Sequence, residues 1–191
     1  MKRLLVSFLT LATLGLAGCP AYSTQPLYTG VDHVLEPALV GTWVNPNSDD
    51  GPVVFKKSDG STYEMVLSDP KTEVTQFYDV HLVRLQGDLF MDIIFRAQQL
   101  KDEEIALPLA TIPAHLIAKL KIAGDELTYS VLDDKSIRKA AEATGGRVSV
   151  SGDDVFKGDV VVTAKTEDLR DFVTRFAGDL FPEDDHLTRK R

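Results

Sequence analysis

Two acids, a histidine and an arginine lie close together in the middle of this chain: Asp79, His81, Asp92 and Arg96. A histidine between carboxylates can act as a general base. A few polar groups among apolar ones are also typical of a small-molecule site. The same residues equally fit a buried, mutually hydrogen-bonded network with a structural role. The residue types leave these three interpretations open.

The sequence around these residues predicts a β-hairpin. Two apolar runs, 77–85 and 89–95, flank Gly87-Asp88, which favours a tight loop. The pairs expected across this hairpin are Leu85 with Phe90, Val83 with Asp92, His81 with Ile94 and Asp79 with Arg96. Both faces carry large apolar side chains, so we expect both to be covered. On the face with the polar residues, the candidate ligand-lining residues are Phe77, Asp79, His81, Val83, Phe90, Asp92 and Arg96.

Two further hairpins are expected. Asp59-Gly60 joins 53–57 to 62–68, and as a two-residue loop it pairs Val54 with Met65. Gly124-Asp125 joins 115–122 to 127–132, where apolar and polar residues alternate cleanly, as in strands with one core face and one wet face.

The other expected elements place the helices late in the chain. Gly41–Val44 is the first strand, 134–144 a short helix, 148–150 and 155–156 a ragged edge pair, and 160–164 the last strand. Thr166 is the expected N-cap of a C-terminal helix. Its apolar stripe at helical spacing comprises Leu169, Phe172, Val173, Phe176 and Leu180. The predicted fold class is therefore mainly β with α: an antiparallel meander of about eight strands, forming a barrel or half-barrel.

Several function classes find no support in the sequence. It contains no nucleophile elbow, P-loop, zinc-protease motif or dinucleotide-binding turn, so we expect no catalysis and no cofactor. The histidines His33, His81, His115 and His186 lack metal-ligand spacing, and the polar loop 45–51 fits a calcium loop poorly, so no metal is expected. The formal net charge is −8, without a basic patch, which argues against nucleic acid as a partner.

The N-terminus carries a targeting signal. Lys2-Arg3 precedes an apolar run that ends in Leu16-Ala17-Gly18-Cys19. This ending resembles the lipobox of bacterial lipoproteins. The resemblance implies that residues 1–18 are a signal peptide and are cleaved. It also implies that Cys19, the only cysteine, carries a diacylglyceryl thioether and an acylated amine with fatty acyl chains such as palmitate. Pro20 in place of Asp points to the outer membrane, facing the periplasm.

The residues after Cys19 divide into three parts: a tether at 19–32, a β-barrel domain at 33–181 and a polar tail at 182–191. Gly41-Thr42-Trp43 at the start of the first strand, with a helix after the last one, resembles the lipocalin-like (calycin) barrels. That resemblance implies an arginine packed on Trp43, for which Arg170 and Arg175 are candidates.

Two functions remain for such a protein. The first is a membrane-tethered module that binds a small apolar or amphipathic ligand without catalysis. The second is a structural or assembly lipoprotein whose barrel surface docks another envelope protein. An open barrel interior would favour the first, and a filled barrel with an exposed apolar patch would favour the second.

Overall fold

The computed structural model describes residues 21–100, 103–106, 114–152, 160–182 and 184–191. The expected signal peptide and Cys19 lie outside the described residues, as do residues 155–156 of the expected edge pair. In the part that is described, no helix is long and apolar enough to cross a membrane.

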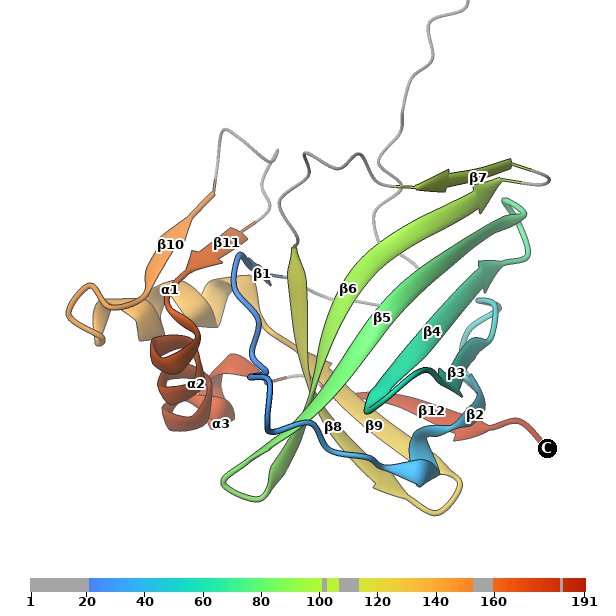
Figure 1. Ribbon diagram of the computed structural model, residues 1–191, viewed down its shortest axis with the longest axis horizontal. Coiled ribbons are helices and arrows are strands. Elements are labelled where there is room, and N and C mark those ends of the chain that lie inside the picture. Colours follow the sequence, from blue (N-terminus) through green and yellow to red (C-terminus); the bar gives the residue numbers. More distant parts are fainter. Residues whose placement is uncertain (1–20, 101–102, 107–113, 153–159, 183) are drawn as a thin grey trace, which may run out of the picture.

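Eight antiparallel strands form a closed barrel (Figure 1). In barrel order the strands are β2 (Gly41–Val44), β3 (Val53–Lys57), β4 (Thr62–Asp69), β5 (Val74–Leu85), β6 (Asp88–Leu100), β8 (His115–Ala123), β9 (Glu126–Val131) and β12 (Asp185–Arg189). Closure comes from the pairing of β8 with β6 and of β12 with both β9 and β2. The expected mainly-β fold with an eight-stranded meander is confirmed, in its closed form.

Three short strands and the three helices form a layer beside the barrel (Figure 1). β1 (Ala21–Ser23) pairs with β8, β11 (Val160–Thr163) with β1, and β10 (Ser149–Ser151) with β11. The helices are α1 (Asp134–Glu142), α2 (Thr166–Arg175) and α3 (Ala177–Leu180), with a 3₁₀ turn at Pro37–Leu39. β7 (Glu103–Ala106) pairs with β6. Lys165, not Thr166, is the N-cap of α2.

The barrel interior is filled by its own side chains. Alternate residues of each strand point inward, and most of those in the centre are apolar. The buried residues are Leu39, Trp43, Val53, Phe55, Tyr63, Met65, Leu67, Tyr78, Val80, Leu82, Leu89, Met91, Ile93, Leu116, Ala118, Leu120, Leu127, Tyr129 and Leu187. These side chains form one continuous hydrophobic core, which an eight-stranded barrel is narrow enough to accommodate.

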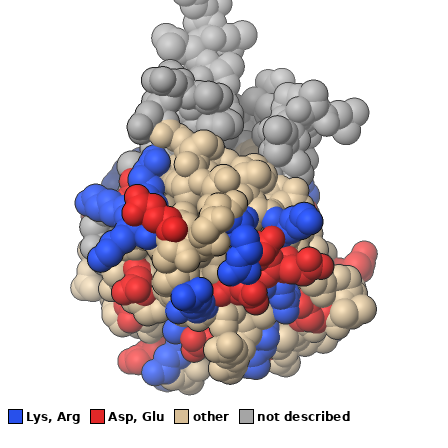
Figure 2. All heavy atoms as spheres, turned by 90° about the vertical axis from the view of Figure 1, so that its left-hand side faces the viewer, with Lys and Arg blue, Asp and Glu red and all other residues tan. Residues whose placement is uncertain are grey.

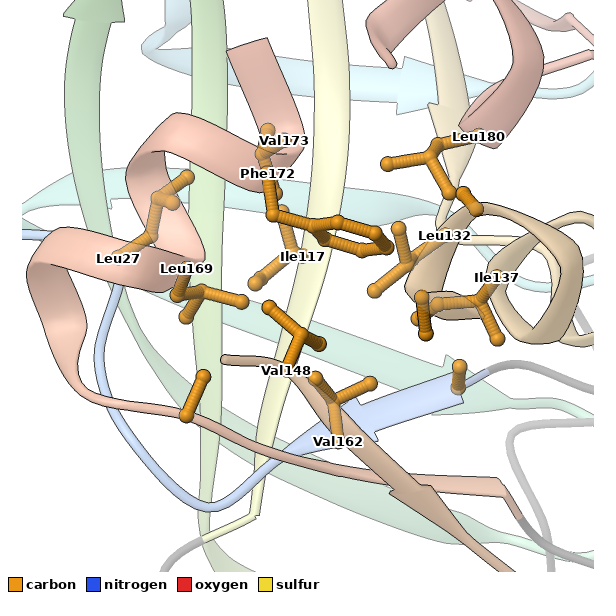
Figure 3. Close-up of a cluster of buried hydrophobic side chains, with 14 of the residues drawn as sticks. Leu27, Ile117, Leu132, Ile137, Val148, Val162, Leu169, Phe172, Val173 and Leu180 are labelled. Atoms are coloured by element: carbon orange, nitrogen blue, oxygen red, sulfur yellow. The ribbon is translucent and has the colours of Figure 1, made fainter. Parts of the chain in front are cut away.

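A second apolar core lies between the outer face of the barrel and the helices (Figure 3). The ring of Phe172 from α2 lies between Ile117 of β8 and Leu132 in Figure 3. Leu169 and Val173 of the predicted stripe are fully buried, and Phe172 is nearly so, whereas Phe176 is only partly buried. The expected amphipathic helix is thus confirmed, although it ends at Arg175 and a short α3 follows.

Two hairpin registers differ from the sequence-based prediction. β5 and β6 join at Gln86-Gly87, whose φ angles are +49° and +96°, so Val83 faces Phe90 and His81 faces Asp92. This shift by two residues leaves every side chain on its expected face. The prediction of a loop at Gly87-Asp88 was wrong. Gln86 occupies a loop position that requires a positive φ, and Gln is unusual at such a position.

The loop between β3 and β4 contains three residues rather than two. The amide of Ser58 donates to the carbonyl of Thr62 at 3.0 Å, so 59–61 form the loop. Only Gly60 takes a positive φ in this loop, +66°, whereas a two-residue loop of the expected type needs two such residues. The one-residue shift makes Phe55, not Val54, the partner of Met65. The third hairpin, at Gly124-Asp125, has the expected register.

Three expected boundaries are corrected. The last barrel strand is β12, inside the expected polar tail, while the predicted last strand forms β11 outside the barrel. Leu187 is the only large apolar side chain of β12, so alternation gave no signal there. The expected tether contains β1 and the fully buried Leu27, and it continues along the outside of the barrel. β1, Leu27 and β12 thus belong to the described fold, although they lie outside the expected bounds of the domain.

Candidate functional site

The predicted polar face of the β5–β6 hairpin points outside the barrel. Val80 and Leu82 of β5 are fully buried on the inner face, so the residues that alternate with them face outward. All seven candidate ligand-lining residues therefore lie outside the barrel interior. Of these, Val83 and Phe90 are buried in the second core beneath the helices.

The structure brings Asp79 and Arg96 together but separates them from the buried residues. Arg96 Nη1 donates to Asp79 Oδ1 at 3.0 Å, and Arg96 also pairs with Glu64. The Arg96 guanidinium lies 5.8 Å from the centre of the Phe77 ring. The Asp79 and Arg96 side chains are each 42% exposed, so this is a partly solvated ion-pair group of small energetic weight.

Asp92 is the centre of a buried polar contact that ties the N-terminal segment to the barrel. Its side chain has no solvent exposure; one oxygen accepts the Leu27 amide at 2.6 Å, and the other lies 2.7 Å from His115 Nδ1. Arg170 of α2 donates to the Leu27 carbonyl at 2.9 Å and pairs with Asp32, which secures the same segment. A buried carboxylate needs such partners, so a structural role accounts for Asp92.

Three histidines surround Tyr28, the residue that follows Leu27. The Tyr28 ring stacks on His81 with centroids 3.9 Å apart, and His33 and His115 lie 5.2 and 6.3 Å from it. Burial lowers the pKa of His81 and raises that of the Tyr28 hydroxyl. The Nδ1 atoms of His33 and His81 are buried and have no hydrogen-bond partner among the described residues. Both nitrogens therefore face packed protein, which is a poor arrangement for a general base acting on a substrate.

Sequence reasoning placed His81 and Asp92 on one face but missed His115, Tyr28 and Leu27. His115 reaches Asp92 only because β8 pairs with β6 in the closed barrel, and no local pattern encodes that pairing. Across the described ranges, no group of three or more His, Cys, Asp or Glu residues is arranged to hold a metal ion.

The arginine that packs on Trp43 is Arg189, not Arg170 or Arg175. Its guanidinium lies 4.2 Å from the indole centre and donates to the carbonyls of Val40 and Ala38 at 2.8 and 2.6 Å. The indole Nε1 donates to the Leu39 carbonyl at 2.9 Å. Trp43 is fully buried, so it is a core residue and not a platform for a ligand.

A cavity of about 520 Å³ lies between α2, the end of the β5–β6 hairpin and the segment after α1. Part of its wall is apolar, from Leu85, Val148, Phe172 and Phe176. The charged part of the wall consists of Arg84, Arg147, Arg170, Arg175, Asp168 and Asp171. Gln86, Thr144 and Thr174 complete it. Its volume lies within the range of small-molecule sites, and polar and charged residues form most of its wall.

Most of the cationic groups at the cavity are already paired. Arg147 lies 3.3 Å from Asp168 and 3.7 Å from Asp171, and Arg84 lies 3.8 Å from Glu36. Arg170 is held by Asp32. Arg175 differs: its guanidinium lies 5.2 Å from the centre of the Phe176 ring, and no carboxylate of the described residues forms an ion pair with it.

Sequence reasoning missed this cavity because three separate segments supply its walls.

No protein-family model matches the chain, and no curated protein or solved structure is significantly similar to it. The geometry of the chain itself is therefore the basis for assigning a function.

Proposed function

We propose that this chain is a lipid-anchored binding protein of the cell envelope that holds a small amphipathic ligand without catalysis, in the cavity beside α2. The cavity of about 520 Å³ carries the proposal, because it combines an apolar wall with guanidinium groups. The packed barrel then serves as a rigid scaffold, and the ligand site is outside it.

Two further observations support the assignment to a lipocalin-like lipoprotein. The contact of Arg189 with Trp43 is of the kind that the lipocalin resemblance implied, an arginine packed on this tryptophan. The lipobox ending at Cys19 supports acylation, with the mature protein held in the outer membrane and facing the periplasm. Several acyl chains together make such attachment stable.

The anchor is tested with Cys19→Ser. The Ser variant should lose metabolically incorporated fatty acid and move from the membrane fraction to the soluble fraction, because acyl chains supply the membrane affinity. Retention of labelled fatty acid by the Ser variant would refute lipidation at this residue.

The ligand site is tested on the mature chain carrying Cys19→Ser, with 1-anilinonaphthalene-8-sulfonate as the fluorescent probe. Saturable binding is expected, and Thr174→Phe should weaken it by about tenfold or more, because Thr174 lines the cavity and a phenyl ring would occupy part of its volume. Glu167→Phe is the control: it lies on the same helix, is exposed and does not line the cavity. Equal binding by the two variants would place the probe elsewhere.

A docking role is the second candidate, and one observation favours it. The large apolar side chains exposed among the described residues are Val31, Leu35 and Val40, at 96%, 46% and 39%, and all belong to one short segment. A Val31→Ser/Leu35→Ser variant that lost a co-purifying envelope protein, while probe binding was unchanged, would support docking over ligand binding. Unchanged co-purification would exclude this segment as the docking surface.

A further inference from the structure

We infer that the ligand of the cavity beside α2 carries an anionic group, a carboxylate or a phosphate ester, and that Arg175 holds it. This inference rests on the proposed function, since it names the ligand class of the same cavity.

The charge distribution at the cavity is the first argument. Four guanidinium groups line it against two carboxylates, although the chain as a whole has a formal net charge of −8. The field of the whole protein therefore disfavours an anion, and local cations are needed to bind one. Figure 2 shows that blue and red side chains lie side by side over much of the face that carries the helices. Among the four guanidinium groups at the cavity, a cation without an acidic partner is the exception.

Arg175 is that exception at the cavity. Arg147, Arg84 and Arg170 each have a carboxylate partner, whereas Arg175 has none among the described residues. Its guanidinium lies near the ring of Phe176, and a planar cation beside an aromatic ring still has its N–H groups along its edges. Those N–H groups match the two oxygens of a carboxylate or phosphate in a bidentate contact.

The apolar wall defines the other end of the ligand. Phe176, partly buried beside Arg175, presents most of the apolar surface of the cavity, and Phe172, Val148 and Leu85 lie behind it with little exposed area. An anion without an apolar part would leave this surface in contact with water. An amphiphile with a short alkyl or aromatic part satisfies both walls, so inorganic phosphate alone should bind weakly.

The test is a calorimetric titration of the mature chain carrying Cys19→Ser. The probes share one alkyl chain and differ in head group: octanoate, octyl phosphate, 1-octanol and octylammonium, each below its aggregation concentration. Both anions should bind at least about tenfold more tightly than the alcohol and the cation, since a charge-assisted contact contributes that much. Added salt should reduce this preference because it screens the exposed guanidinium. The tighter of the two anions identifies the head group.

Arg175→Gln should weaken octanoate and octyl phosphate by about tenfold and leave 1-octanol unchanged. Arg138→Gln is the matched control, an exposed arginine on α1 that donates to the Gly152 carbonyl and does not line the cavity. Arg175→Lys keeps the charge without the planar fork, and should restore part of the affinity. All three substitutions are at exposed helix positions, and unchanged melting temperatures would verify folding.

The outcomes separate the two proposals. If all four probes bind equally, Thr174→Phe weakens them and Arg175→Gln does not, then the anion inference is wrong and the binding function stands. If the anions bind but Arg175→Gln and Arg138→Gln weaken them equally, Arg175 is not the contact. If no probe binds, both the inference and the proposed ligand site are refuted.

Discussion

The contact between Arg189 and Gly41 explains why the first barrel strand begins with glycine. Gly41 has φ +146°, a backbone conformation that side chains disfavour, and a Cβ at this position would overlap Nη1 of Arg189. Two separate costs are therefore expected for Gly41→Ala: backbone strain, and displacement of the guanidinium from Trp43 and from the carbonyls of Val40 and Ala38.

The two costs can be estimated from the contacts. Arg189→Ala removes two hydrogen bonds from a charged donor, one contact with the indole face and a half-exposed ion pair with Asp125 that contributes little. Since Ala38 and Val40 are exposed and their carbonyls can rehydrate, the loss is about 2–3 kcal/mol, below the sum of the isolated values. Strain at residue 41 adds about 1–3 kcal/mol. Gly41→Ala should thus cost about 3–6 kcal/mol alone and about 1–3 kcal/mol when Arg189 is already Ala.

Urea denaturation of the two single variants and the double variant measures this coupling. Trp43 is the only tryptophan, so its fluorescence follows unfolding directly, and far-ultraviolet circular dichroism provides a probe remote from the substitutions. The double variant should be more stable than the summed single effects predict, by about 2 kcal/mol. Strict additivity would show that Gly41 is required only by its backbone conformation and that the steric argument is wrong.

Three other predictions follow from burial and turn geometry. Phe172→Ala should lower the free energy of unfolding by about 3–5 kcal/mol and Phe176→Ala by less, because Phe172 is 2% exposed and Phe176 is partly buried; equal urea midpoints would contradict this packing. Burial lowers the pKa of His81 in the folded state, so its contribution to stability is complete above the ordinary value of 6.5 and is lost as pH falls toward the lower folded pKa. The free energy of unfolding, measured by urea titration, should therefore decrease less between about pH 7.5 and pH 5 in His81→Gln than in the parent protein. An unchanged pH dependence would show that His81 does not cause this decrease. Gly60→Val should reduce the melting temperature more than Ser58→Ala, because Gly60 has φ +66°, and similar losses would mean that the loop tolerates a branched residue.

The local elements of this protein could be predicted from the sequence because short-range patterns encode them. The loop at Gly124-Asp125 and the alternation around it specified both strands and their register, which the structure confirms. The stripe of α2 likewise identified Leu169, Phe172 and Val173 as core residues. In both cases the periodicity of one element, set by its own backbone geometry, is visible within about ten residues of sequence.

Only the tertiary structure decided which apolar surface became the barrel interior and where a ligand site could form. Both faces of the β5–β6 hairpin are rich in apolar residues, so its pattern could not distinguish the barrel face from the helix-covered face. That choice followed from closure by β8 and β12. The Trp43–Arg189 contact, the Asp92–His115 pair and the cavity beside α2 join segments distant in sequence, and their spacing carries no periodic signal.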